Sequence, residues 1–234
     1  MSDARPAGRG PFPVVVRSGT PAELVLDLPE PGDERLAVLA RPDSSALVLG
    51  STQDEGTIDV SIVEGDLPTI RRRSGGGAVL VRPGAQVWLD LFVPVNDRLA
   101  DTDIGRAARF AGEIWIAALA GILGPASADL RAHVGPLQST RWSSRLCFCG
   151  LGPGEVTLGG RKLVGLSQRR DRRGAWFFTM AHLQFDPVGL AALVRGLEAS
   201  ERAGLVTELE HTVTALELSA EQVEGALRAV LMSG

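Results

Sequence analysis

Lysine is nearly absent from this sequence. It contains 24 lysines and arginines, and Lys162, in the segment GGRKLVG (159–165), is the only lysine. Asn96 is likewise the only asparagine, and there is no tyrosine, which fits a drift of the coding DNA toward G and C. Such drift spares lysine where the chemistry needs a compact point charge instead of a planar guanidinium. Composition alone does not separate that interpretation of Lys162 from chance survival.

A second segment suited to chemistry is RRRSGGGAV, residues 71–79. Three consecutive glycines let the backbone approach a ligand closely and offer N–H groups to an anion. The arginines before them could grip a carboxylate or a phosphate in bidentate fashion. The residues that follow complete neither a P-loop nor a dinucleotide-binding motif. A flexible turn beside a solvated basic surface is the alternative interpretation.

Cys147 and Cys149 are the only cysteines. Their spacing suits neither a disulfide framework nor a complete zinc site, so we expect no protein-bound metal. A cysteine beside a cation can serve as a nucleophile, because a nearby ammonium favours the thiolate. Both cysteines could equally be small apolar core residues. The two interpretations remain open on these residues alone.

The overall composition is that of a soluble globular protein. The chain has 234 residues, 44% hydrophobic and 22% charged, with a net charge of −4, which gives no reason to expect nucleic acid as a partner. The N-terminus lacks the pattern of a signal peptide. The most apolar stretch, residues 110–123, is too short to span a bilayer and contains Glu113. We therefore expect a reduced, cytoplasmic protein that does not enter a membrane.

A mixture of strands and helices must position these motifs. Residues 1–19 are rich in Pro, Gly and Arg and are expected to be loose, whereas 20–234 are expected to form a single domain with a helical C-terminal end. Helices are predicted at 20–28, where Thr20 is the cap, at 102–123 and, weakly, at 58–65, and a Ser219–Gln222 capping box precedes the last helix. Strands are predicted at 35–40, 46–50, 69–73, 86–94, 128–134, 145–148, 155–158, 161–169 and 175–185.

The segment QVWLDLFVP, residues 86–94, is the clearest strand. Its alternation places Val87, Leu89, Leu91 and Val93 on one face. The strands and helices do not follow a strict βαβ order. The pattern therefore predicts an α/β (α+β) fold with a mixed, largely antiparallel central sheet flanked by helices.

Three motifs together resemble the lipoate–protein ligase family. The segment 71–79 resembles its Arg-Arg-x-Ser-Gly-Gly-Gly-Ala-Val signature, GRKLVGLSQRR (160–170) resembles its Gly-Arg-Lys segment, and ALVLGSTQ (46–53) resembles its strand ending in Gly-x-x-Gln. Their order and spacing fit, and the resemblance runs from about residue 20 to the C-terminus. It implies the fold shared by lipoate and biotin protein ligases and octanoyltransferases.

The resemblance also implies roles for individual residues. In the family, the lysine at the position of Lys162 contacts the acyl carbonyl and, in ligases, the phosphate of the acyl-adenylate, where a compact ammonium can follow developing charge. Arg72 and Ser74 match the arginine and serine of the substrate loop. The positions that match its ligand-cradling glycines are Gly75, Gly76 and Gly77.

One stretch resembles the cysteine-dependent octanoyltransferases of the same superfamily. In RLCFCGLGPGEVTLGGRK, residues 145–162, Cys147, Glu155 and Lys162 fall on matching positions. There the cysteine carries the acyl group as a thioester before a lysine accepts it, without ATP. Cys149 has no counterpart and is expected to be structural.

Other positions depart from the ligase pattern. Val81 and Arg82 replace a His-Asp pair of the ligases, no asparagine follows them within the segment, and FFT (177–179) replaces a His-His-Gly run. The segment PGAQVWLDLF, residues 83–92, looks closer to the biotin-ligase strand. His182 occupies an apolar position of the strand pattern, which predicts a strand residue instead of a catalyst. These departures weaken the case for ATP use more than the case for acyl-group binding.

The expected function is therefore protein lipoylation. The chain would attach a lipoyl or octanoyl group to a lysine of a lipoyl acceptor domain or of the H-type carrier protein of glycine cleavage. A ligase would use lipoate or octanoate with ATP and Mg, and a transferase would use Cys147 and an acyl carrier protein. The resemblance implies no tightly bound cofactor. The alternatives are a family member that only binds lipoyl or biotinyl groups, and a biotin–protein ligase.

Overall fold

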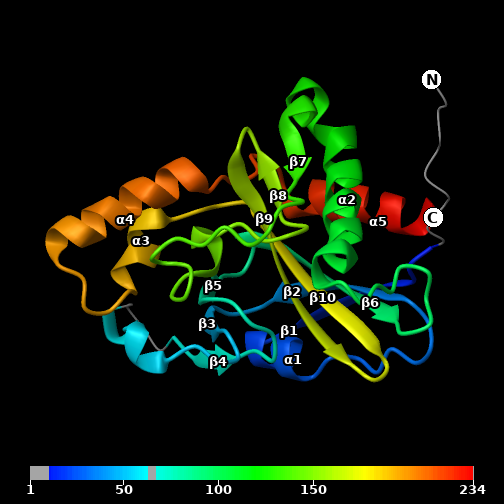
Figure 1. Cartoon of the computed structure of the whole chain (residues 1–234), viewed down its shortest axis with the longest axis horizontal. Helices are drawn as coiled ribbons and strands as arrows, with labels where there is room; N and C mark the ends of the chain where they lie inside the picture. The colour runs from blue at the N-terminus through cyan, green and yellow to red at the C-terminus, as the bar shows by residue number, and fades with distance from the viewer. Residues whose placement is uncertain (1–10, 63–66, 234) are drawn as a thin grey trace.

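A seven-stranded sheet forms the centre of the molecule in the computed structural model, which describes residues 11–62 and 67–233 (Figure 1). The strand order is β1-β2-β6-β10-β9-β8-β7, and every neighbouring pair is antiparallel except β1–β2. In that order, the strands are Val14–Gly19, Leu36–Pro42, Gln86–Pro94, Gly174–His182, Arg161–Asp171, Val156–Leu158 and Leu130–Ala132. The predicted mixed, largely antiparallel sheet is confirmed.

A second, three-stranded sheet carries the glycine-rich segment. Its order is β4 (Thr69–Arg71), β3 (Ala46–Leu49) and β5 (Val79–Val81). Because β4 is parallel to β3 and β5 is antiparallel to it, residues 72–78 must cross the end of β3. The glycines therefore lie beside Gly50, the residue that follows this strand.

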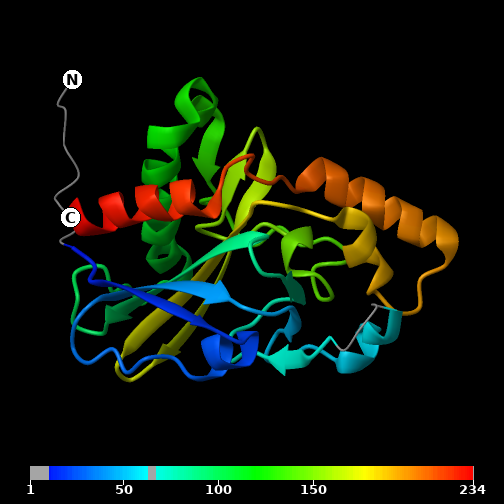
Figure 2. The same cartoon turned by 180° about the vertical axis from the view of Figure 1, so that it is seen from behind.

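Two helices cover one face of the large sheet. α2 (Ile104–Leu123) and α5 (Ala220–Ser233) lie against each other and against the sheet (Figures 1 and 2). The β6 residues Val87, Leu89, Leu91 and Val93 bury their side chains in the core that these helices complete, which confirms the predicted shared face. Trp115 of α2 is fully buried and donates a hydrogen bond to Thr179 Oγ1 at 2.8 Å.

The segment Ile104–Asp129 is long and apolar enough to cross a membrane when judged by length and composition, with a mean hydropathy of 1.4. The core helix of a soluble protein passes the same test. The buried side chains of α2 lie in the main core.

The opposite face of the large sheet is buried as well. All nine residues of β6 are buried. Trp88 packs with the small sheet and with the short helix α1 (Pro21–Leu26), and Phe92 packs with Val38 and Trp176. The small sheet and α1 thus form a second layer, and any space between the two sheets is lined mainly by apolar side chains.

A third cluster of buried side chains lies at one end of the small sheet. It joins α3 (Pro187–Ala192), α4 (Ala199–Thr212) and the 3₁₀ turn η4 (Cys147–Cys149), which lie together in Figure 1. The remaining 3₁₀ turns are η1 (Glu55–Thr57), η2 (Val60–Ile62) and η3 (Gly124–Asp129).

Most predicted elements are confirmed. The strand 86–94 has the predicted bounds, and the helix predicted at 102–123 spans Ile104–Leu123. Thr20 caps α1, and the Ser219 hydroxyl accepts a hydrogen bond from the main-chain N–H of Gln222 in the predicted capping box. Of the weak helix predicted at 58–65, the described residues form only the 3₁₀ turn η2, and residues 63–65 lie outside the described part of the chain.

Two sequence-based expectations are wrong. Residues 145–148 do not form a strand, because Leu146 makes one isolated bridge to Ala78 and the chain then turns into η4. Residues 14–19 of the segment expected to be loose form β1, since the β-branched run pairs with β2 and Phe12 is buried in the main core. Residues 1–10 lie outside the described part of the chain.

Candidate active site

The glycine-rich loop packs backbone against backbone. A Cβ added to Gly50 would lie 1.8 Å from the Gly76 carbonyl oxygen, and one added to Gly77 would lie 2.6 Å from Leu146 N. The loop therefore leaves no room for side chains at these positions. Ala78 N donates to the Arg145 carbonyl at 2.8 Å, and Cys147 N donates to the Ala78 carbonyl at 3.0 Å. These bonds place Cys147 directly beside the glycines.

Arg72 and Ser74 hold this loop in shape. The Arg72 guanidinium donates to the carbonyl oxygens of Gly75 at 2.6 Å and Gly77 at 2.9 Å. Ser74 is buried, and its Oγ lies 2.9 Å from Ser167 Oγ on β9. Both residues, which were predicted to bind substrate, thus make contacts within the protein. These contacts fix the backbone positions of the exposed residues Gly75 and Gly76.

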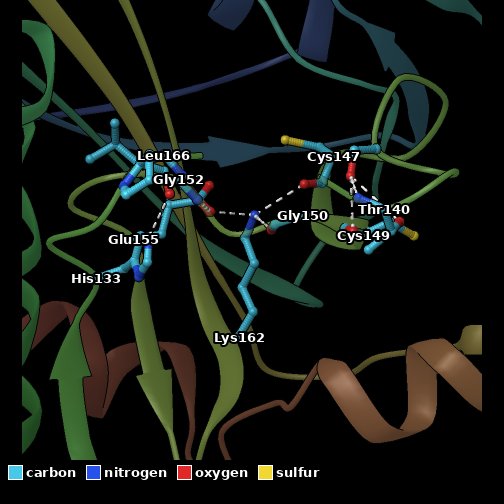
Figure 3. Close-up of polar contacts among 11 residues, drawn as sticks. His133, Thr140, Cys147, Cys149, Gly150, Gly152, Glu155, Lys162 and Leu166 are labelled. Carbon is cyan, nitrogen blue, oxygen red and sulfur yellow. Dashed lines mark hydrogen bonds and ion pairs between the residues drawn. The ribbon is translucent and has the colours of Figure 1, made fainter. Parts of the chain in front are cut away.

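Lys162 lies on β9 and is only 4% exposed. Its ammonium pairs with Glu155 Oε2 at 2.7 Å and donates to the carbonyl oxygens of Cys147 at 3.0 Å and Gly150 at 2.8 Å (Figure 3). An ammonium has three N–H donors, and three oxygen acceptors surround this one. Lys162 therefore ties β9 to the turn that carries Cys147.

Glu155 is buried with its lysine partner. Its Oε1 accepts a hydrogen bond from Leu166 N at 2.9 Å, and its Oε2 accepts one from Gly152 N at 2.7 Å. Buried ion pairs are tolerated when further hydrogen bonds replace the lost water, as they do here. The turn before Glu155 packs tightly on α2, since a Cβ on Gly154 would lie 2.4 Å from the Ala108 carbonyl.

The two cysteines differ in their surroundings. Cys147 is half-buried, and a Cβ added to Gly76 would lie 3.5 Å from its Sγ. In Figure 3 the Lys162 ammonium is joined to the Cys147 carbonyl oxygen, and the sulfur projects in another direction. Cys149 is buried, and burial raises the pKa of its thiol to about 12. Cys147 is therefore the thiol that can meet a ligand at the glycine loop.

Cys147 lines a narrow, mainly apolar cavity of about 60 Å³ between the two sheets, referred to below as the inner cavity. The small sheet contributes Val48, Val79 and Val81, and Arg72 also reaches this cavity. The large sheet contributes Gly165, Met180 and Trp88. The inner cavity can accept an aliphatic chain whose reactive end lies near the thiol.

A second cavity, the outer cavity, has a volume of about 220 Å³. It shares Val79 and Phe148 with the inner cavity and continues along Ala78–Leu80 to His182 and Asp186. Phe148 fits between them because Gly165 lacks a side chain, as a Cβ there would lie 3.0 Å from the Phe148 ring. The two cavities therefore meet at the residue that follows Cys147.

His182 is a strand residue, as predicted, although β10 ends there and not at residue 185, and it lines the outer cavity. The centroid of its ring lies 4.3 Å from the ring centroid of Phe148 and 5.0 Å from that of Phe185. Both ring nitrogens are buried without a hydrogen-bond partner among the described residues. Burial, and then the charge of Lys162, lowers the pKa of His182 to about 3, so the ring is neutral near pH 7.

We expect His182 to make the protein less stable in acid. The unfolded imidazole titrates near about 6.5, and the folded pKa is about 3, so between these values the unfolded state binds the extra proton. Stability should fall by up to about 1.4 kcal/mol per pH unit as pH drops through this window. Urea unfolding at pH 7 and pH 5 should show a smaller loss for His182→Leu than for the wild type. An equal loss of unfolding free energy in His182→Leu and in the wild type would contradict this prediction. His211→Gln, on the exposed side of α4, is the control.

The structure brings all the predicted site residues into one region. Arg72, Ser74 and Gly75–Gly77 form the loop, and Cys147 and Lys162 lie on the elements bonded to it. Sequence reasoning did not single out Phe148, Gly165 or Trp88, which shape the cavities. The first two lie within the quoted motifs. Among the described residues, no cluster of three or more His, Cys, Asp or Glu side chains could hold a metal ion.

The chain is similar to known proteins in its sequence and in its fold. A family model described as the lipoyl protein ligase A/B catalytic domain matches residues 22–227. No curated protein sequence matches the chain. The fold is similar to that of a bi-partite lipoate protein ligase of Thermoplasma acidophilum, with a TM-score of 0.70, 17% identity and coverage of 96% of this chain and 83% of the other.

Two further solved structures share the fold. A lipoate-protein ligase A bound with ATP has a TM-score of 0.56 and 16% identity, covering 95% of this chain and 94% of its own. LipL1 of P. falciparum in complex with lipoate has a TM-score of 0.55 and 11% identity, covering 95% and 72%. Likeness at such identities establishes the fold and not the activity. The family model spans most of the chain, and the chain therefore belongs to the lipoyl protein ligase A/B catalytic domain family.

Proposed function

We propose that this protein transfers an octanoyl or lipoyl group to a lysine of an acceptor domain, with Cys147 as the covalent carrier. The observation that carries the proposal is the position of Cys147, whose half-buried thiol lies beside Gly76 and lines the apolar inner cavity. An acyl chain in this cavity would have its carbonyl carbon near the sulfur and its oxygen near the glycine-loop backbone.

The reaction has two steps. The Cys147 thiolate attacks the carbonyl carbon of a donor thioester, a new C–S bond forms and the donor C–S bond breaks, and the donor thiolate leaves and takes up the proton that Cys147 gave up. The neutral amine of the acceptor lysine then attacks the Cys147 thioester, the amide C–N bond forms, the Cys147 C–S bond breaks, and the Cys147 thiolate takes up the proton that the amine loses. Glycine-loop N–H groups such as those of Gly75 and Gly76 would stabilise the oxyanion of each tetrahedral intermediate.

Lys162 supports this chemistry by holding the turn that carries Cys147. It fixes the carbonyl oxygen of Cys147 and the turn up to Gly150, and so it orients the thiol toward the inner cavity. Its charge would also favour negative charge that develops on the acyl oxygen. A direct contact with that oxygen would require one of its carbonyl bonds to exchange.

The second candidate is an ATP-dependent ligase. The observation in its favour is the outer cavity, about 220 Å³ in volume, which adjoins the glycine loop and is not used by the thioester route. A structural relative is a lipoate-protein ligase A bound with ATP. In this route the lipoate carboxylate would attack the α-phosphorus of Mg-bound ATP, which forms the acyl-adenylate and releases pyrophosphate, and the acceptor lysine amine would then displace AMP.

The acceptor in either route is expected to be a small lipoyl domain or an H-type carrier protein. Support comes from the archaeal relative, which was described with its E2 lipoyl domain. We place the reaction in the cytoplasm, with an acyl carrier protein as the donor for the thioester route.

The routes can be separated by the donor they use. The pure protein is incubated with an acceptor lipoyl domain and either octanoyl-loaded acyl carrier protein or lipoate with ATP and Mg, and the intact mass of the acceptor is measured. Octanoylation from the carrier without ATP supports the transferase, and ATP-dependent lipoylation alone would replace it with the ligase. Binding of acyl groups without any product would favour the non-catalytic family member.

We expect Gly76→Val to lower the transfer rate at least about tenfold, a loss of roughly 1.4 kcal/mol. Gly76 has a φ of +97°, and an added Cβ would lie 2.8 Å from Arg72 Nη2, so valine would strain the loop and displace the guanidinium. Gly75→Ala is the matched control, because a Cβ there meets no atom within 4 Å. Rates are measured with the octanoyl carrier. Equal rates for the two variants would show that the loop does not bind the acyl group.

A further inference from the structure

The inner cavity runs across the strands of the large sheet. Gly165, Met180 and Trp88 are register partners on β9, β10 and β6, and Ala40 of β2 follows them. Gly165 contacts Phe148, next to Cys147. Neighbouring strands lie about 4.8 Å apart, so the backbone of Trp88 lies two strands, or roughly 10 Å, across the sheet from that of Gly165.

Trp88 separates the inner cavity from the core beyond it. The indole lines the cavity and also belongs to a buried cluster with Leu24, Val25 and Ala40. These side chains are small or aliphatic, and they offer no polar group to a ligand. A smaller residue at position 88 would therefore extend the cavity toward α1 as apolar space.

Asp90 fixes the orientation of this indole. Trp88 Nε1 donates to Asp90 Oδ1 at 2.7 Å, and the bond is buried. Asp90 is 1% exposed and faces the same side of β6 as Trp88, in register with Val38 and Phe178. Burial raises the pKa of Asp90 to about 8. Burial of a carboxyl group costs free energy. Here the Asp90 carboxyl gives the indole N–H a fixed hydrogen-bond acceptor.

We propose that Trp88, oriented by Asp90, closes the inner cavity and limits the acyl chain to about eight carbons. A fully extended peptide advances about 3.5 Å for each residue, which has three backbone bonds. With a similar advance per bond for an aliphatic chain, the roughly 10 Å between Gly165 and Trp88 corresponds to roughly eight bonds. Trp88 is then a specificity-determining residue, and Asp90 is a positioning residue that acts through it. This inference rests on the proposed function, because it takes the inner cavity as the acyl site.

The test compares chain-length preference in wild type and variants. Octanoyl- and dodecanoyl-loaded carriers compete for the protein, and the ratio of the two acyl masses on the acceptor is measured. Trp88→Leu should move the ratio at least tenfold toward dodecanoyl, and Trp88→Phe should move it less. Trp176→Leu is the matched control, because Trp176 is also a buried tryptophan of the large sheet but does not line the inner cavity.

The role of Asp90 is tested by a conservative pair of variants. Asp90→Leu removes the acceptor of the indole N–H and should relax the preference, whereas Asp90→Asn keeps an acceptor and should retain it. A purely structural role would change the melting temperature without changing the acyl ratio. If Trp88→Leu shows the same acyl ratio as the wild type, the proposal is overturned.

Binding measurements distinguish this inference from the proposed function. Calorimetry with octanoate and dodecanoate needs no catalysis and is run on wild type and Trp88→Leu. If neither the wild type nor Trp88→Leu transfers acyl groups but Trp88→Leu gains affinity for dodecanoate, the proposed transferase function fails and the chain-length role of Trp88 stands. If transfer occurs with an unchanged preference, the chain-length role fails and the transferase stands. If the wild type neither transfers nor binds either chain, both fail.

Discussion

Cys147→Ser is expected to abolish formation of a covalent acyl adduct, while Cys149→Ser should keep it. The thiolate is the nucleophile, and only Cys147 combines a half-buried position with the glycine loop and the inner cavity. Cys149 is buried and stays a thiol, since its pKa is raised to about 12. Wild-type protein mixed with octanoyl carrier should gain one octanoyl group in intact-mass spectra, and hydroxylamine should remove it.

Two further results bear on this prediction. Cys147 should be alkylated faster than Cys149 near neutral pH, which can be followed by peptide mapping after timed iodoacetamide treatment. The ligase route predicts no adduct and an ATP-dependent product that survives Cys147→Ser. Activity of Cys147→Ser with lipoate and ATP would therefore reject the thioester route and leave the ligase.

Replacement of Lys162 is expected to have the second large effect. Lys162→Met leaves the Glu155 carboxylate buried without its cation, which should cost about 3–5 kcal/mol of folding stability. It also frees the carbonyl oxygens of Cys147 and Gly150 that the ammonium binds. Lys162→Arg keeps a charge but brings a wider, planar group into a site that is 4% exposed. Transfer should fall at least about tenfold in either variant.

A double variant separates folding from catalysis. Lys162→Met with Glu155→Gln removes both charges, so urea unfolding should show that part of the lost stability returns. The transfer rate should stay low, because the charge near the acyl oxygen is still absent. Recovery of the rate together with stability would assign Lys162 a structural role alone. A well-folded Lys162→Arg protein with wild-type rates would exclude any need for an ammonium.

The sequence alone determined the features that depend on neighbouring residues. Alternation along 86–94 identified β6, and helical spacing identified α2, because side-chain periodicity follows directly from local backbone geometry. The residues suited to chemistry were also readable as types and spacings. Cys147 and Lys162 come from two motifs that lie close together in the chain, and the fold places them in contact.

Local patterns misjudged segments whose structure depends on distant partners. The residues 14–19 form a strand because β2 lies beside them, and 145–148 turn into η4 because Ala78 offers a single bridge. Alternation in β6 showed which residues share a face, but it could not show that both faces are buried. That outcome required the small sheet to pack over Trp88.

Only the tertiary structure decided how the site is enclosed. The Lys162 ammonium meets the carbonyl oxygens of Cys147 and Gly150 only after η4 has packed against β9. The row Gly165, Met180, Trp88 joins the hairpin of β9 and β10 to β6, which lies far away in the chain. Sequence periodicity records which way a side chain points from its own strand. Long-range strand pairing and packing decide which side chains face each other across a cavity, and these arise only when the whole chain folds.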